Sequence, residues 1–485
     1  MANNHQRLHA IFIPYPLQGH VIPSIHLAIK LASRGFTISF INTQFIHHQI
    51  SKAQPDTIGD NIFAEAHKSG LDIRYYTVSD GLPLGFDRSI NHDQFMASLL
   101  HVFSAHIEEL IRKIIIKSSS NSIQPVNCLI ADTFFVWPSM ISKKLGLPYV
   151  SFWTEPALVY SLYYHMDLLR KNGHFGSNDN REDTINYIPG VPAIEPTDLM
   201  SYLQDTDLST VVHEIIFKAF DDAKGADFII CNTVQELEPE TISALQVDKP
   251  FYAIGPIFPT GFTKSNVATS LWVESDCTQW LDSKPNGSVL YVSFGSYAHV
   301  SKNDLTEIAH GLLLSKVNFV FVLRPDVVSS DEPDPLPEGF LEESKDRGII
   351  VQWCCQIAVL SHPAVGGFLT HCGWNSILES IWCGVPILCF PLLTDQFTNR
   401  KLVVDDWRIG LDIDSRKLIA RKEVSAKINR LMEDKLGQEF RKEIKEVKKA
   451  LQNASKDDGS SEKNFNQFVK DLTVLIGQKS GTQLV

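Results

Sequence analysis

Short apolar runs alternate with helical segments in both halves of the chain, and this alternation limits the fold more than any other feature. The first unit has an apolar run at Leu8–Ile13, a loop at Tyr15–His20, a helix that we expect to begin at Pro23 and to be ended by Gly35, and a second run at Phe36–Ile41. A strand, a helix and a second strand in this order form a crossover, so the two strands should lie parallel in one sheet. Further buried strands are predicted at Cys128–Ala131, Tyr149–Phe152, Phe228–Cys231, Val289–Phe294, Phe319–Leu323, Ile349–Gln352, Gly367–Thr370 and Pro386–Phe390. The sequence therefore predicts an α/β fold with doubly wound sheets.

The chain is too long for one hydrophobic core, since 485 residues suit two domains of about 200 residues or more each. The stretch 249–270 contains three prolines and is predicted to be a linker between domains at 1–248 and 271–455. Residues 456–485 are predicted to hold a last amphipathic helix, and the acidic, Pro-rich stretch Asp326–Arg347 is predicted to be a surface loop.

Composition excludes several classes of protein. A net charge of −12 argues against nucleic acid as the main partner, because phosphate backbones require basic patches. The N-terminus has no signal-peptide pattern, and no apolar run approaches the roughly 18 residues of a membrane-spanning helix. Eight cysteines in a chain of this length suggest free thiols in a reducing compartment, so we expect a cytoplasmic protein. Cys354, Cys355, His371 and Cys372 fit no common zinc spacing, so we expect no metal.

The run Trp353–Gln396 carries the most specific chemical pattern in the chain. At its centre, the letters THCGWNSILES place His371 at the end of a strand and begin a helix at Gly373. The first turn of a helix presents unpaired backbone N–H groups and a partial positive charge, which suit a phosphate group. Glu379 projects from the same helix face as Asn375, one turn deeper, where its carboxylate can accept hydrogen bonds from two sugar hydroxyls. The pattern predicts a nucleotide-sugar site.

Polar side chains follow four of the predicted strands at their carboxyl ends: His20, Asp132, Ser296 and His371. Ligands of doubly wound sheets bind outside these ends, so we expect the four side chains to face one cleft. The YPLQGH loop that ends at His20 has one glycine and no GxGxxG pattern, which counts against an NAD or FAD enzyme.

The run Trp353–Gln396 resembles the donor-binding box of the plant family 1 UDP-dependent glycosyltransferases in length and at nearly all its marker positions. The resemblance extends over the whole chain, from YPLQGH near the start to DGSSEKNF near the end. It implies the GT-B architecture, in which two doubly wound domains face each other across a cleft. Residues 1–248 would bind the acceptor, residues 271–455 would bind the UDP-sugar, and the helix within 456–485 would return to the first domain.

The resemblance places His20 and Asp132 where the family carries its catalytic base and the partner of that base. Histidine can take a proton from a hydroxyl near neutral pH, and a buried carboxylate on its other nitrogen fixes the tautomer and stabilises the cation. The two residues are far apart in the sequence, so their contact is an expectation. Asp132 could instead cap the segment that follows it, and His20 could be an ordinary histidine in a chain that has 17.

The resemblance assigns the donor contacts by position. Trp353 would stack on the uracil, although it could instead be a core tryptophan; Gln356 would cover the base or the ribose, and Glu379 would accept from the ribose hydroxyls. The diphosphate would be bound at the helix start by Gly373, Asn375 and Ser376, together with His371 and Ser296. The sugar would be contacted by Asp395, Gln396, Trp374 and Thr154. Gln at the last box position is typical of glucose donors. No cofactor or metal is expected, and UDP-glucose would be the donor substrate.

The chain departs from the family pattern at three positions. Proline is common where Cys355 stands, and glutamate is often found where Leu313 stands, but neither position touches the inferred chemistry. Glu155 places a carboxylate beside Thr154, where small residues are commoner. Our hypothesis is that Glu155 tunes the choice of donor or acceptor.

Aromatic residues are frequent in the segments expected to line the acceptor pocket, although each could instead belong to the core. They are Phe86, Phe95, Phe134, Phe135, Trp137, Trp153, Tyr160, Tyr163 and Tyr164. Such a lining fits a small apolar acceptor with a hydroxyl or carboxyl group, such as a flavonoid, a terpenoid or a phenolic. The prediction is an inverting, monomeric hexosyltransferase of plant secondary metabolism. The alternatives are a nucleotide-sugar or small-molecule binding protein of the same fold without turnover, and a phosphorylase or epimerase.

Overall fold

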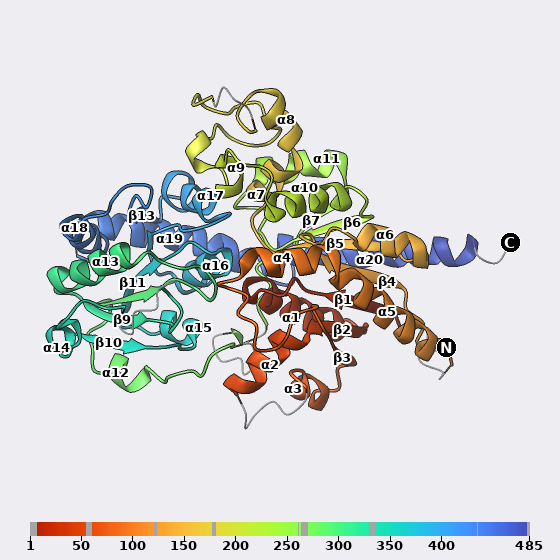
Figure 1. Cartoon of the computed structure of the whole chain (residues 1–485), viewed down its shortest axis with the longest axis horizontal. Coiled ribbons are helices and arrows are strands. Elements are labelled where there is room, and N and C mark those ends of the chain that lie inside the picture. The colour runs from red at the N-terminus through yellow and green to blue at the C-terminus, as the bar shows by residue number, and fades with distance from the viewer. Residues whose placement is uncertain are drawn as a thin grey trace.

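The computed structural model contains two α/β domains that lie side by side along the longest axis of the molecule (Figure 1). It describes residues 7–54, 61–120, 124–176, 181–259, 261–262, 270–328, 335–433 and 435–482. The predicted linker 249–270 and the predicted loop Asp326–Arg347 lie partly outside the described residues.

Within the described residues, the first domain contains a parallel sheet of seven strands in the order β3-β2-β1-β4-β5-β6-β7. The strands are β1 (His9–Ile13), β2 (Thr37–Thr43), β3 (Ile73–Val78), β4 (Cys128–Asp132), β5 (Tyr149–Trp153), β6 (Phe228–Cys231) and β7 (Phe251–Ala253). The helices around it are α1 (Gln18–Ser33), α2 (Gln44–Ala53), α3 (Ala64–Lys68), α4 (His92–His101), α5 (Phe103–Ser120), α6 (Pro138–Leu145), α7 (Ala157–Tyr164), α8 (Met166–Lys171), a 3₁₀ turn (Pro196–Asp198), α9 (Ser201–Gln204), α10 (Val211–Ala223) and α11 (Pro239–Asp248). The strand order changes direction between β1 and β4, which opens a crevice at the carboxyl ends. Strand β7 falls inside the predicted linker, so the first sheet extends past residue 248.

The second domain repeats this arrangement with a parallel sheet of six described strands in the order β10-β9-β8-β11-β12-β13. The strands are β8 (Val289–Ser293), β9 (Asn318–Val322), β10 (Gly348–Val351), β11 (Val365–Thr370), β12 (Ile387–Cys389) and β13 (Gly410–Asp412). The helices are α12 (Thr278–Asp282), α13 (Lys302–Ser315), α14 (Phe340–Ser344), α15 (Gln356–Leu360), α16 (Trp374–Cys383), α17 (Gln396–Lys401), a π-helical turn (Leu402–Asp406), α18 (Arg421–Met432) and α19 (Lys435–Ala454). One more helix, α20 (Ser460–Thr482), follows them in the chain. Here the order changes direction between β8 and β11, which gives the second crevice.

The strands predicted from the sequence are present, each within two residues of its predicted ends. Both faces of these strands are buried: in β1, Ile11 and Ile13 pack into one cluster, and Ala10 and Phe12 pack into another. Burial on both faces produces the continuous apolar runs. The sequence did not predict β3, β7 and β13, and all three are edge strands. The four middle residues of β3 and the last two of β13 are only half-buried, so neither strand has a continuous apolar run.

The predicted start of the first helix was wrong: α1 begins at Gln18, so His20 lies in its first turn and Pro23 lies inside the helix. Proline lacks the N–H that would donate to the carbonyl of Gly19 in the preceding turn. The side chain of Asn375, from the second domain, donates to this carbonyl at 2.7 Å. The second domain thus satisfies the group that Pro23 leaves without its helical partner.

The last helix, α20, packs on the first domain, where it contacts β7 (Figure 1). Phe465, Phe468 and Leu472 are fully buried in the cluster that covers one face of the first sheet. The Phe468 ring lies 5.9 Å from the Phe228 ring and 5.7 Å from the Tyr252 ring, measured between centroids. The first and last described elements, β1 and α20, therefore pack in the same domain.

We expect Phe468→Ala to lower the free energy of unfolding of the first domain by about 3–5 kcal/mol, because it leaves a cavity under α20. Urea denaturation followed by tryptophan fluorescence measures this change. The matched control is Val474→Ala on the same helix, where the side chain is exposed and the expected change is about 0.5 kcal/mol or less. Equal small effects from both substitutions would contradict the packing of α20 described above.

Candidate functional site

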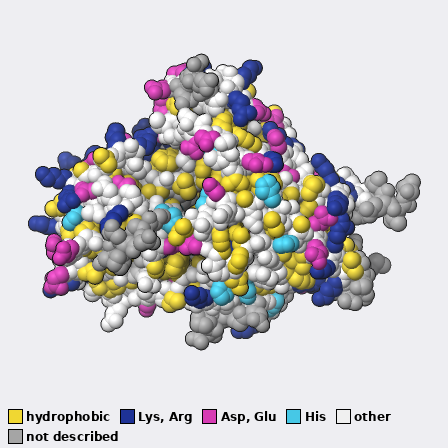
Figure 2. All heavy atoms as spheres, in the orientation of Figure 1, with side chains coloured by type: hydrophobic (Ala, Val, Ile, Leu, Met, Phe, Trp, Pro, Cys, Tyr) yellow, Lys and Arg dark blue, Asp and Glu magenta, His cyan; other side chains and the backbone are white. Residues whose placement is uncertain are grey.

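A cavity of about 1130 Å³ opens between the two domains. Segments that follow β1, β4 and β5 line it from the first domain, and segments that follow β8, β11 and β12 line it from the second. In Figure 2, hydrophobic side chains show in the middle of the face between the domains, and acidic and basic side chains are interspersed around its outline. Among the site residues predicted from the sequence, all line the cavity except Asp132, which is buried behind His20.

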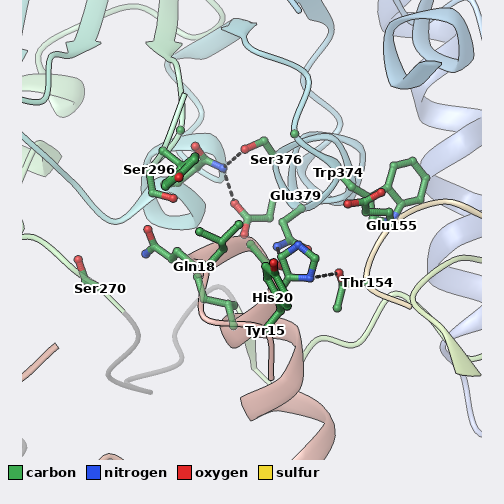
Figure 3. A pocket seen from close by; sticks show the side chains of 18 of the residues that line it. Tyr15, Gln18, His20, Thr154, Glu155, Ser270, Ser296, Trp374, Ser376 and Glu379 are labelled. Carbon is green, nitrogen blue, oxygen red and sulfur yellow. Dashed lines mark hydrogen bonds between the residues drawn. The ribbon is translucent and has the colours of Figure 1, made fainter. Parts of the chain in front are cut away.

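His20 and Asp132 form the expected contact. The Nδ1 atom of His20 lies 2.8 Å from Oδ2 of Asp132, which is the last residue of β4. A proton shared with the carboxylate sits on Nδ1, so Nε2 becomes the nitrogen that can accept. Thr154 Oγ1 lies 2.9 Å from the same Nδ1 (Figure 3). The alternative role of Asp132 is also present, because its Oδ1 accepts from the backbone N–H of Phe134 at 3.0 Å.

Gln356, Ser376 and Glu379 form a hydrogen-bonded group on the opposite wall (Figure 3). Gln356 Nε2 donates to Ser376 Oγ at 2.9 Å and to Glu379 Oε2 at 2.7 Å. Burial raises the pKa of Glu379 to about 7, and the hydrogen bond from Gln356 opposes this shift. Trp353 is half-buried and lines the same wall. The group therefore offers a carboxyl acceptor near an indole ring.

The start of α16 also faces the cavity. Its N-cap is Gly373, which provides no side-chain cap for the first N–H groups of the helix. The ring of His371 lies between two glycines: a Cβ atom would come within 2.4 Å of His371 Nε2 at Gly295 and within 2.6 Å at Gly373. Burial and the nearby Arg324 lower the pKa of His371 to about 4, so the ring is neutral near neutral pH. Ser296, on the loop after β8, lines the cavity close by.

Asp395 and Gln396 lie at the start of α17, and hydrogen bonds fix both side chains. The two oxygens of Asp395 accept from Thr394 Oγ1 and from Asn399 Nδ2, each at 2.5 Å. Gln396 Oε1 accepts from two backbone N–H groups of the preceding loop, at 2.9 and 3.0 Å. Since that oxygen is occupied, the NH₂ group of Gln396 is the part of its amide left for a ligand.

Hydrogen bonds from the start of α16 join the two domains. Trp374 Nε1 donates to the carbonyl of Asn232, just after β6, at 2.7 Å. Asn375 Nδ2 donates to the carbonyl of Gly19 at 2.7 Å. The helix that offers an anion site is therefore held against the turn that carries His20.

The aromatic lining predicted from the sequence needs correction. Phe134 and Tyr163 line the cavity, but the other seven do not. Phe95, Phe135, Trp137, Trp153 and Tyr160 are buried in the core, and Phe86 and Tyr164 are half-buried away from the cavity.

Residues that the sequence did not single out line this part of the cavity instead. They include Tyr15, Met96, Tyr202, Val212, Ile215 and Ile216. Most of them come from α4, α9 and α10, where an apolar helix face that lines a pocket has the same pattern as one that packs in a core.

Two absences hold for the part of the chain that the structure describes. No group of three or more His, Cys, Asp or Glu residues is arranged there to hold a metal ion. No helix within the described ranges is long and apolar enough to cross a membrane.

Family models match two parts of the chain. One, described as "Glycosyltransferase, N-terminal domain", matches residues 6–149, and another, described as "UDP-glucoronosyl and UDP-glucosyl transferase", matches residues 265–449. UDP-glycosyltransferase 86A1 of Arabidopsis thaliana is 63% identical over 97% of this chain and 96% of its own length. The 7-deoxyloganetin glucosyltransferase of Gardenia jasminoides is 36% identical over 98% of both chains.

Solved structures show the same fold. Phytolacca americana UGT2, complexed with UDP-2fluoro-glucose and pterostilbene, is 28% identical and has a TM-score of 0.76, covering 96% of this chain and 100% of its own. A UDP-glucose:anthocyanidin 3-O-glucosyltransferase in complex with UDP is 26% identical and has a TM-score of 0.79, covering 96% of this chain and 99% of its own. These similarities confirm the GT-B architecture.

Proposed function

The chain belongs to the plant family 1 UDP-dependent glycosyltransferases, and from this premise we propose that it transfers glucose from UDP-glucose to a hydroxyl or carboxyl group of a small apolar acceptor. The observation that carries the proposal is one cavity in which His20, backed by Asp132, lies opposite the start of α16. A base on one wall and an anion site on the other meet the two needs of transfer from a nucleotide sugar.

The donor would lie along the second domain. Trp353 would stack on the uracil, and Gln356 and Glu379 would hold the ribose, because Glu379 lines the cavity one helical turn past Asn375. The diphosphate would lie at Gly373, Asn375, Ser376 and Ser296, where helix N–H groups and hydroxyls can donate. The uracil, the ribose and the diphosphate would thus lie in this order along the wall, from Trp353 to the start of α16.

In the proposed reaction, His20 Nε2 takes the proton from the acceptor group while the acceptor oxygen attacks C1 of glucose. The bond between C1 and the β-phosphate oxygen breaks on the opposite face, and its electron pair leaves with UDP. Asp132 holds Nδ1–H, so it favours the receptive tautomer before proton transfer and stabilises the cation afterwards. A single displacement of this kind inverts C1 and gives a β-glucoside.

Negative charge that develops on UDP would be stabilised by donors rather than by a metal. The uncapped start of α16 presents its N–H groups, and His371 presents a neutral ring beside them. We propose that no metal takes part, because the N–H groups at the start of α16 face the place where the diphosphate would lie.

The choice of glucose is supported by the polar groups at the far end of the cavity. Asp395 offers fixed carboxylate oxygens, Gln396 offers its NH₂ group, and Trp374 and Thr154 also line the cavity. The names of several relatives also specify glucosyltransferases. The proposed location of the enzyme is the cytoplasm, which suits eight free cysteines.

The acceptor would occupy the part of the cavity next to His20. Tyr15, Phe134, Met96 and Tyr202 line this region, together with the apolar face of α10. Such a surface favours a flat or compact apolar molecule, such as a flavonoid, a terpenoid or a phenolic, whose reacting group points at His20.

We expect His20→Ala to slow acceptor-dependent UDP release by about 10²–10⁴-fold, because the step loses its base. The measurement is UDP release from UDP-glucose with a panel of phenolic, terpenoid and carboxylic acceptors. The affinity for UDP-glucose, measured by calorimetry, should stay unchanged. His48→Ala is the matched control, since His48 is exposed on α2 outside the cavity.

Two results of that assay would contradict the proposal. Full activity of the His20→Ala variant would remove His20 from the chemistry. Tight binding of UDP-glucose without UDP release from any acceptor would favour a binding protein of this fold without turnover.

The affinity for UDP-glucose should depend on pH through Glu379. Its raised pKa of about 7 means that the carboxyl gains a proton below pH 7, and a protonated carboxyl is a poorer acceptor for ribose hydroxyls. We expect the dissociation constant to be flat above pH 8 and to rise by up to about tenfold for each pH unit below 7. Calorimetry between pH 5.5 and 8.5 measures it, and UDP-glucose is preferable to UDP because its diphosphate does not titrate in this range.

The control for this effect is Glu379→Gln, which keeps the shape of the side chain but cannot titrate. Its affinity should be weaker and independent of pH. A pH dependence that is the same in the variant and in the original protein would assign the effect to another group.

A further inference from the structure

Glu155 is a buried carboxyl without a hydrogen-bond partner in the cavity wall. It follows β5, directly after Thr154, and only 9% of its surface is exposed. Its Oε2 atom is buried and has no hydrogen-bond partner among the described residues. The residue nevertheless lines the cavity, so its remaining exposed surface faces the space that a ligand would fill. An unsatisfied buried polar group is costly, so a hydrogen-bond partner supplied by a ligand in the cavity would stabilise this carboxyl.

The surroundings of Glu155 favour the neutral form of its carboxyl. Burial, followed by the charges of Asp395 and Asp132, raises its pKa well above the usual range. Burial also raises the pKa of Asp395, but donors on both of its oxygens oppose that shift. Of two nearby acids, the one without donors keeps the proton. Glu155 therefore carries an O–H donor, and Asp395 beside it is an acceptor.

The position of Glu155 identifies what it can reach. Figure 3 shows it beside Trp374, on the far side of Thr154 from His20 and away from Ser296. The nucleotide would lie at the opposite end of the site, where Trp353 and Glu379 line the wall. The end near Trp374 and Asp395 is the place left for the sugar.

We propose that Glu155 is a specificity-determining residue whose carboxyl donates a hydrogen bond to a hydroxyl of the transferred sugar. The inference rests on the proposed function and adds a contact to it. A sugar hydroxyl both donates and accepts, so it can donate to Asp395 and accept from Glu155. The two acids together also disfavour an anionic sugar at this end.

The test is a double-mutant cycle in which one change is made in the protein and the other in the donor. Dissociation constants are measured by calorimetry for UDP-glucose and for its analogues deoxygenated at C3, C4 or C6, with the original chain, Glu155→Leu and Glu155→Gln. Glu155→Leu should weaken the binding of UDP-glucose by about tenfold, because the hydrogen-bond donor is lost. One analogue, which lacks the partner hydroxyl, should bind the original chain more weakly than UDP-glucose does. Glu155→Leu should not weaken the binding of this analogue further, because the hydrogen bond is already absent. Glu155→Gln should stay within about twofold of the original chain for all four donors, because its N–H can donate.

Additive losses for all three analogues would overturn the role of Glu155, and so would equal losses in the Leu and Gln variants. UDP itself serves as the control, because it lacks the sugar: its affinity should be the same in every variant, which shows that each one is folded. If the original chain bound neither UDP nor UDP-glucose, the proposed function would fail first. Binding of all four donors with additive losses would remove only the contact from Glu155.

Discussion

The hydrogen bond between His20 and Asp132 can form only because of how the strands of the first sheet are ordered. β1 and β4 are parallel neighbours, and Ile13 pairs with Ala131 at their carboxyl ends. Asp132 therefore lies beside the first turn of the helix that follows β1, and its carboxylate reaches His20 Nδ1. This contact leaves Nε2 as the acceptor nitrogen on the cavity side. The whole proposal for the acceptor depends on that orientation.

The second domain is attached to the same turn. Pro23 has no N–H for the carbonyl of Gly19, and Asn375 supplies a donor from the start of α16. Gly19 immediately precedes His20, and Asn375 lies in the first turn of the proposed diphosphate site. One contact between the domains thus holds His20, the proposed base, in line with the proposed diphosphate site. A substitution at Pro23 would change that alignment without touching either substrate.

The sequence placed His20, Asp132 and the start of α16 at strand ends, because each follows a continuous apolar run, and the family resemblance paired His20 with Asp132. It could not give the start of α1, because proline usually marks the first turn of a helix and the partner of Gly19 comes from another domain. Nor could it separate the acceptor wall from the core: Trp153 and Tyr163 are both aromatic and buried, but only Tyr163 lines the cavity. Side-chain direction in a loop or helix depends on tertiary packing. The isolation of Glu155 was equally hidden, since a missing hydrogen-bond partner is a property of the folded protein.

In the proposed mechanism, a single base, His20, acts on one face of the donor. Asp132 is held by His20, both oxygens of Asp395 accept hydrogen bonds, and burial favours the neutral form of Glu155, so none of these carboxyls is placed as a free nucleophile for C1. The most direct test is the anomeric configuration of the first product, measured by proton NMR before the glycoside can re-equilibrate. Transfer from α-linked UDP-glucose should give the β-glucoside alone. An α-glucoside would require a second displacement and would contradict the single-base mechanism.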